Sequence, residues 1–430
     1  MALLVTCLLL CSILSTVSAG IASKASAGTT DPAQGKTSGQ VQLAPTLHTP
    51  PPTPAPGAPN CTTIVATDTD PAMQWFCQGS GARGCTNRHV VCAPPPTSTT
   101  TQSNTTAAVD NAASKGLVVF LPGTYLQPSD YSHIVAEFSH HGFHALGLFY
   151  PSAEGQNGCG ASRAAHPTDL NCTATERFKV LTGADNGGHT NITAADSIVN
   201  RVAKALAFLG PPWSDYLDAE TKAVRWSDVI ISGHSNGADH AGFLSKNFNV
   251  SRALMFAGPN DNVGARGLDL YYPPAPWVFR NWTSNVTGQT ATPPGRLYGF
   301  GVCGYRGAMG QHPSDDECWH WHPGWEAMGM AGPWFKADAI PALSDARSFA
   351  GLRHICSSAL LPHGSSGDGY NHMASAADCC MPRFPDNYTD PALAGRVLWT
   401  NIFLHMLTSP TGIPPPPPAP GNASSCACVK

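Results

Sequence analysis

The stretch that decides the fold covers residues 229 to 237 and reads Val-Ile-Ile-Ser-Gly-His-Ser-Asn-Gly. Its first four residues, Val229–Ser232, are mostly β-branched and apolar, which predicts a buried strand. The next five match the pattern G-x-S-x-G, in which small residues let the chain turn sharply from a strand into a helix. Apolar residues then recur at helical spacing, at Ala238, Ala241, Leu244 and Phe248. We therefore expect Ser235 in a strained turn with its Oγ exposed.

The chain around this turn alternates short apolar runs with helical patterns between residues 114 and 412. Further strands are predicted at Leu117–Leu121, His144–Phe149, Arg252–Ala257 and Leu297–Val302. One helix is expected after a cap at Ser129, and another after a capping box formed by Thr193 and Asp196. This alternation predicts an α/β fold with a mostly parallel central sheet and helices on both faces.

A serine hydroxyl is a poor nucleophile until a base takes its proton. His372 is the predicted base, because it lies late in the chain in the glycine-containing loop 367–372 and an imidazole pKa near 6.5 suits proton transfer at neutral pH. His363 is the alternative. The bare pattern also fits a glycine-rich turn with an idle serine, so the surrounding residues have to support the catalytic interpretation.

An acid should orient the imidazole and stabilise its charged form. The segment between Cys303 and Cys318 contains Asp315 and Asp316, and we favour Asp315, then Asp316. Asp261, which follows the preceding strand, is an alternative position. These carboxylates could instead solvate a loop that a disulfide closes.

Developing charge on the attacked carbonyl oxygen requires backbone N–H donors. Asn236, directly after the serine, supplies one candidate, and Thr124 or Tyr125 supplies the other. Gly123 lets this second loop approach closely, although a plain Pro-Gly turn would look the same.

With these motifs the chain resembles the α/β-hydrolase superfamily, and it is similar to a largely uncharacterised group of secreted or bacterial serine hydrolases. The resemblance covers about residues 117–382. Besides the Ser235 turn, it rests on these segments: 118–124, 147–151, 256–259 with Asp261, 325–329, and His372 with Asp378. It implies an α/β-hydrolase fold and hydrolase chemistry without indicating a substrate.

The beginning of the chain predicts that the protein is secreted, and composition predicts its domain organisation and excludes some partners. Residues 1–19 resemble a signal peptide, 20–60 form an Ala/Ser/Thr/Pro-rich spacer, 61–113 a cysteine-containing extension, 114–412 the catalytic domain and 413–430 a proline-rich tail. Only 12% of residues are charged, the net charge is −4, and no Lys/Arg cluster occurs. The sequence therefore argues against nucleic-acid binding and a polybasic membrane anchor.

The cysteines and the glycosylation motifs also predict an extracellular, oxidising environment. Of 15 cysteines, thirteen follow the signal peptide, with local groups at 61–92, 159–172 and 303–318 that suggest disulfides. No C-x2-C pair occurs, so no metal is expected. Nine sequons, several times the number expected by chance, predict N-linked glycans; they are Asn60, Asn104, Asn171, Asn191, Asn249, Asn281, Asn285, Asn387 and Asn422.

These expectations combine into a secreted serine hydrolase that needs no cofactor and acts on a small-molecule or polymer-linked carboxylic ester. A peptidase or amidase with the same residues is the second interpretation. The third is a non-catalytic extracellular matrix protein, which the proline-rich tails favour and the intact serine, histidine and glycines disfavour. Those tails also suggest association with a cell wall or matrix.

Overall fold

The computed structural model describes residues 60–74, 86–95, 114–153, 159, 169–263, 273–281, 290–302, 318–330, 335–336, 351–357, 370–390 and 392–410. The predicted signal peptide, most of the spacer, the proline-rich tail, His363, Asp315 and Asp316 lie outside these residues. Within the described part of the chain, no helix has the length and apolar character needed to cross a membrane.

Nine strands form one sheet in the order β1-β2-β4-β3-β5-β6-β7-β9-β8. Their bounds are β1 Asn60–Val65, β2 Arg88–Ala93, β3 Leu117–Leu121, β4 His144–Gly147, β5 Val229–His234, β6 Arg252–Phe256, β7 Leu297–Val302, β8 Phe335–Lys336 and β9 His354–Ser357. β2 pairs antiparallel with both β1 and β4, and every other pairing is parallel. The predicted mostly parallel sheet is therefore confirmed.

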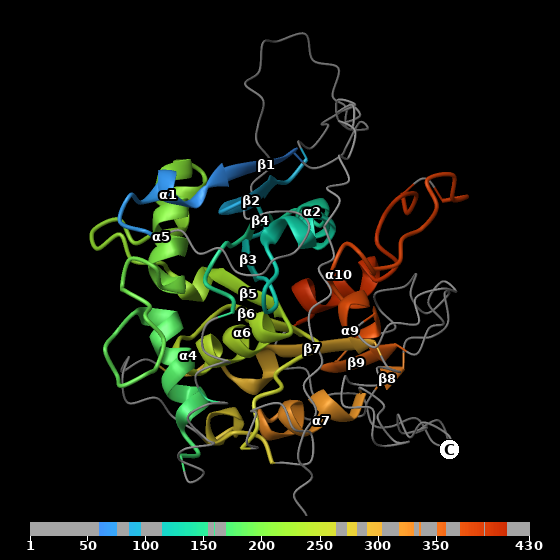
Figure 1. The fold of residues 1–430 in the computed structure, drawn as a ribbon. Helices are drawn as coiled ribbons and strands as arrows, with labels where there is room; N and C mark the ends of the chain where they lie inside the picture. Colours follow the sequence, from blue (N-terminus) through green and yellow to red (C-terminus); the bar gives the residue numbers. More distant parts are fainter. Residues whose placement is uncertain are drawn as a thin grey trace, which may run out of the picture. The chain divides into compact units, whose positions relative to one another are not determined.

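Helices cover both faces of this sheet (Figure 1). They are α1 Ala66–Thr69, α2 Ser132–His140, α4 Cys172–Thr182, α5 Ile198–Leu209, α6 Asn236–Asn247, α7 Cys318–Ala327, α9 Tyr370–Ala374 and α10 Thr400–Thr408. Short 3-10 helices lie at Pro128–Tyr131, Trp213–Tyr216, Trp226–Asp228, Pro276–Val278 and Pro294–Arg296.

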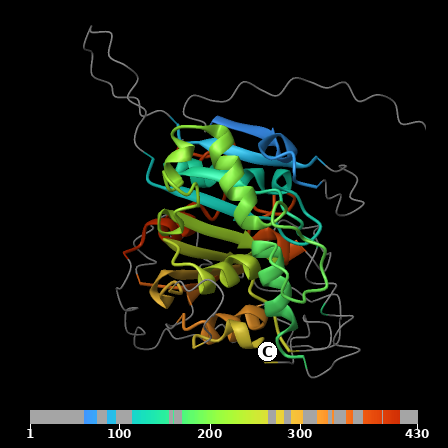
Figure 2. The same cartoon turned by 90° about the vertical axis from the view of Figure 1, so that its left-hand side faces the viewer.

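The core has two layers because alternate side chains of a strand point to opposite faces. In β3, Val119 and Leu121 join the cluster that packs under α4, α5 and α6, while Val118 and Phe120 join the cluster under α2 and α10. Figure 2 looks onto the side covered by α4 and α5. Strand order, covered faces and a strand–turn–helix after β5 together make this an α/β-hydrolase fold.

Most predicted strand bounds differ from the observed ones by two residues or fewer, and Leu117–Leu121 and Leu297–Val302 agree at both ends. The helix starts differ more. The capping residue of α5 is Ser197, which accepts a hydrogen bond from Asn200 N, and not Thr193. Thr193 and Asp196 do bond to each other, but they form a turn before the helix. The two signals stand four residues apart, and the chain uses the later one.

The cap expected at Ser129 was wrong for a different reason. Ser129 belongs to a 3-10 turn, and α2 begins only at Ser132. The carboxylate of Asp378 accepts hydrogen bonds from the backbone N–H groups of Ser132 and His133, both at 2.9 Å. A carboxylate at a helix start satisfies orphan N–H groups and complements the helix dipole. Because this cap comes from 246 residues away, no local pattern could reveal it.

The described part of the predicted cysteine-containing extension, residues 61–74 and 86–95, contributes two strands to the central sheet. β2 pairs with β4 through Val90, Val91 and Cys92, and β1 then pairs with β2. Cys61 and Cys92 stand opposite each other in that pairing and form a disulfide. β2 is mostly buried between β1 and β4, and β1 forms this edge of the sheet.

A second predicted disulfide, Cys159–Cys172, is confirmed. A third joins Cys379 to Cys380 and was not expected, since adjacent cysteines rarely suggest a pair from sequence alone. Cys77, Cys85 and Cys303 lie outside the described residues.

Candidate active site

The candidate residues meet at one edge of the sheet because they follow the carboxyl ends of parallel strands. β3 has β4 on one side and β5 on the other, so the chain reverses its direction of travel across the sheet between β3 and β5. Ligands in open α/β sheets bind at such a switch point, beyond the carboxyl ends of the strands. Residues 123–125 follow β3, and Ser235 follows β5.

Ser235 has the strained backbone conformation that its motif predicts. Its φ is 54° and its ψ is −123°, between the last residue of β5 and the first of α6. The N–H of Ser235 donates to Phe256 O at 2.9 Å, and its carbonyl accepts from Ala238 and Asp239. A non-glycine residue persists in this region only where its surroundings hold it, and such strain gathers at functional sites. The side chain is only partly buried.

The two glycines of the motif are required by close backbone contacts. A Cβ on Gly233 would lie 2.2 Å from Gly237 O, and a Cβ on Gly237 would lie 2.0 Å from Leu121 O. Both distances are far inside van der Waals contact, and the obstructing atoms are backbone. Because neither glycine has a side chain, α6 can begin directly against the end of β3.

The loop after β3 lies against the same turn. Leu126 N donates to Gly123 O at 3.1 Å, which closes a four-residue turn with Tyr125 at φ 61°. A Cβ on Gly123 would lie 3.2 Å from His234 Nδ1, so the loop packs on the residue before the serine. Asn236 is the first residue of α6, and its N–H has no acceptor within that helix.

His372 lies beside His234, the residue that precedes Ser235. It is on the short helix α9, rather than in the loop that the sequence suggested. Its ring centroid lies 4.7 Å from that of His234, and its carbonyl oxygen lies 2.8 Å from His234 Nε2. Burial lowers the pKa of His372 to about 4. The imidazole is therefore neutral at pH 7, which is the state that a general base requires.

Two carboxylates that the sequence analysis singled out, those of Asp261 and Asp378, bind partners other than His372 in the described part of the chain. Asp261, the alternative acid, accepts two hydrogen bonds from Arg177 and one from the indole of Trp277. Asp378, the acidic residue that the resemblance associated with His372, caps α2. Asp315 and Asp316, the favoured acids, remain predictions because they lie outside the described residues.

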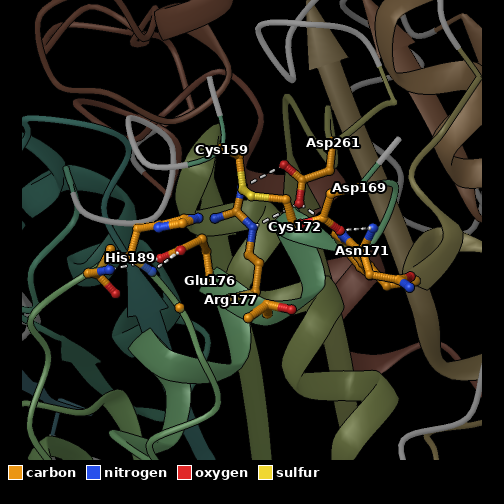
Figure 3. The surroundings of a disulfide bond; sticks show 12 residues. Cys159, Asp169, Asn171, Cys172, Glu176, Arg177, His189 and Asp261 are labelled. Atoms are coloured by element: carbon orange, nitrogen blue, oxygen red, sulfur yellow. Dashed lines mark hydrogen bonds and ion pairs between the residues drawn. A yellow bond between two sulfur atoms is a disulfide. The ribbon is translucent and has the colours of Figure 1, made fainter. Parts of the chain in front are cut away.

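Sequence reasoning missed a buried charge cluster that contacts Asn236, the residue after Ser235. Arg177 on α4 donates to Asp239 and Asp261, with Nη2 2.8 Å from an oxygen of each. Its Nη1 also donates to the side-chain oxygen of Asn236. Figure 3 shows Arg177 and Asp261 facing each other next to the Cys159–Cys172 disulfide. The cluster fixes the residue whose N–H is the candidate oxyanion donor.

The sequence around Arg177 does not indicate that it belongs to a buried charge cluster. Its acceptors stand 59 to 84 residues further along the chain. A charged residue in a helical pattern is usually solvated, but Arg177 is 3% exposed.

One group of potential metal ligands occurs in the described part of the chain, formed by Cys172, Glu176 and His189. The sulfur of Cys172 is in the disulfide with Cys159, whereas a cysteine binds a metal through its thiolate. Glu176 accepts hydrogen bonds from the backbone N–H groups of His189 and Thr190 (Figure 3). The group is therefore structural in this arrangement.

Comparison with known proteins finds no matching family model and no matching curated protein. Among solved structures, the chain is similar to a thermophilic esterase from Thermogutta terrifontis: 14% identity, 74% of this chain and 89% of that chain covered, TM-score 0.30. It is also similar to the AtxE2 isopeptidase: 10% identity, 81% and 39% covered, TM-score 0.31. At such scores these likenesses carry no argument about activity, and the fold class rests on the sheet order and the turn at Ser235.

Proposed function

We propose that the protein is a serine hydrolase that cleaves carboxylic esters through an acyl-enzyme. Ser235 is the nucleophile, His372 the base, and Asp315, or else Asp316, the acid that orients His372. The observation that carries the proposal is the strained Ser235 at the β5–α6 turn, with the His372 helix against the preceding residue.

The reaction proceeds in two stages. His372 takes the hydroxyl proton as Ser235 Oγ bonds to the ester carbonyl carbon, and the N–H of Asn236 with that of Thr124 or Tyr125 holds the oxyanion. The tetrahedral intermediate then expels the alcohol, which receives the proton from His372. Water then attacks the acyl carbon as His372 takes its proton, and the second tetrahedral intermediate releases the carboxylic acid as Ser235 Oγ leaves and recovers the proton from His372.

Esters are the preferred substrate class because an alcohol leaves more readily than an amine. A peptidase or amidase with the same residues is the second candidate, and a non-catalytic matrix protein is the third. An ester panel beside a peptide panel separates the first two.

The test of the nucleophile uses short p-nitrophenyl esters and a fluorophosphonate probe. We expect Ser235→Ala to abolish both hydrolysis and labelling, and His372→Ala to reduce both strongly. Ser232→Ala is the matched control, because Ser232 is a buried serine in β5, the strand that leads to Ser235. Unchanged hydrolysis by Ser235→Ala would refute the mechanism, and an unlabelled wild type would favour the matrix protein.

The acid is tested by comparing Asp315→Asn with Asp316→Asn. Replacing the residue that orients His372 should lower kcat more than replacing the other, because an amide favours the wrong imidazole tautomer. Equal, small effects of both substitutions would place the acid elsewhere in the chain.

Secretion and N-linked glycosylation belong to the same proposal. Six sequon asparagines fall in the described part of the chain, and the side chains of all six are exposed: Asn60, Asn171, Asn191, Asn249, Asn281 and Asn387. Exposure is a requirement for a carrier of a bulky glycan. For protein made in a eukaryotic secretory host, we expect an N-terminus at Gly20 and a loss of mass on glycosidase treatment. An unprocessed Met1 and no mass change would contradict both.

A further inference from the structure

The residue before the nucleophile, His234, connects two segments that the proposed reaction must hold in register. His234 is completely buried at the end of β5. Its Nδ1 lies 2.9 Å from the hydroxyl of Tyr131, and its Nε2 lies 2.8 Å from the carbonyl oxygen of His372. One imidazole thus touches the α2 side of the site and the helix that carries the base.

The hydrogen bonds around His234 allow one protonation pattern. Gly123 N donates to the Tyr131 hydroxyl oxygen at 3.1 Å, so the single hydroxyl proton of Tyr131 is directed to His234 Nδ1. Nδ1 is then the acceptor, and Nε2 carries the proton that it donates to the carbonyl of His372. In the other tautomer, the lone pair of Nε2 would face that carbonyl oxygen.

The chain of bonds therefore runs from Gly123 through Tyr131 and His234 to His372. At one end is the loop with the candidate donors Thr124 and Tyr125, and at the other is the proposed base. The His372 carbonyl lies near the end of α9 and also accepts a hydrogen bond from the Ser375 hydroxyl at 3.2 Å. Tyr131, like His234, is completely buried, so water does not compete for these bonds.

We propose that His234 is a positioning residue that clips the oxyanion loop and the base helix together across the nucleophile turn. This inference rests on the proposed function for its catalytic consequence, but the clip itself is a structural link. It touches no reacting atom. Its effect is to hold Gly123 and His372 at fixed places relative to Ser235.

Two substitutions break the clip one arm at a time. His234→Asn keeps a side-chain oxygen near the place of Nδ1 and loses the bond to His372. His234→Gln keeps an amide N–H near the place of Nε2 and loses the bond from Tyr131, as does Tyr131→Phe. The matched control is His144→Asn with Tyr216→Phe. His144 Nδ1 also bonds to a tyrosine hydroxyl, at 3.2 Å, but His144 begins β4 and so lies at the amino ends of the strands, away from Ser235.

The first readout is ester hydrolysis. We expect each clip variant to lower kcat by about 10- to 100-fold with little change in KM, since a displacement of about 1 Å costs this much and no substrate contact is lost. The control pair should keep the wild-type kcat. A wild-type kcat in His234→Asn would overturn the inference, while loss of activity in Ser235→Ala would leave the proposed function intact.

The second readout, hydrogen exchange of the full chain, does not depend on activity. His234→Asn should speed exchange in the segment 372–377, and His234→Gln and Tyr131→Phe should speed it around Gly123. If the wild type cleaves no ester, the proposed function fails and this pattern alone decides whether the clip exists. Uniform exchange changes, or none, would refute the clip.

Discussion

The guanidinium of Arg177 binds the carboxylate of Asp261 through two hydrogen bonds, Nε to Oδ2 at 2.9 Å and Nη2 to Oδ1 at 2.8 Å. The same guanidinium binds Asp239, so one buried cation faces two carboxylates. Burial raises the pKa of Asp239 above its ordinary value, and the charge of Asp261 adds to the effect. The cluster therefore favours a proton on Asp239, which brings its net charge close to zero.

Arg177→Met should destabilise the fold by about 3–5 kcal/mol, because it leaves the carboxylate of Asp261 buried without a cation. Urea unfolding at pH 7 measures the loss. The control is Arg225→Met, which removes an exposed pair with Asp228 and should cost about 1 kcal/mol or less. Similar losses in the two variants would contradict a role for burial.

Gly237→Ala should prevent formation of the native turn. Its Cβ would lie 2.0 Å from Leu121 O, and both segments are backbone that cannot move without separating β3 from α6. Gly242→Ala lies in the same helix, and its nearest neighbour is the flexible sulfur of Met255 at 3.2 Å. Circular dichroism melting should show a folded Gly242→Ala protein and an unfolded or strongly destabilised Gly237→Ala protein. A native-like melting curve for Gly237→Ala would show that the turn tolerates a side chain.

Stability should fall as the pH drops from 6.5 to 5. Burial lowers the pKa of His89 to about 3 and of His405 to about 4, and holds those of His234 and His240 well below 6.5. In this window the unfolded chain binds protons that the folded chain excludes, so each such histidine costs about 1.4 kcal/mol per pH unit. The raised pKa of Asp239 has the opposite effect on stability and offsets the contribution of one such histidine.

Urea midpoints at pH 7 and pH 5 measure this slope, and His240→Gln should reduce it by one proton. A midpoint that stays constant or rises toward pH 5 would show that these imidazoles are accessible to protons in the folded state.

If His372 is the base, the acid limb of kcat/KM should lie below pH 6.5 and toward 4. Burial lowers the pKa of this imidazole to about 4, and activity requires its neutral form. Initial rates with a p-nitrophenyl ester between pH 4 and 8, in buffers that keep the protein folded, measure the limb. A half-maximal rate above pH 7 would point to a different titrating group.

Much of the scaffold could be predicted from sequence because its signals are local. The buried strands are runs of apolar residues, such as Leu117–Leu121, and the glycines beside Ser235 announce a sharp turn. The helix starts at Ser132 and Ile198 were misjudged where two capping signals competed or where the cap came from a distant residue. The pairing of β2 with β4 could not be predicted for a related reason, since cysteine spacing does not reveal which sheet a strand joins.

Local sequence is enough to predict the covalent and local features: the strained serine turn, the strands with two buried faces and the order in which candidate groups occur along the chain. Which of these groups meet depends on how the elements pack. The structure shows that Asp261, an alternative acid in the sequence, binds Arg177, and that Tyr131 and His372 each lie beside one ring nitrogen of His234. The physical reason is that hydrogen-bond and charge partners in a packed interior are chosen by distance in space, which sequence separation does not report.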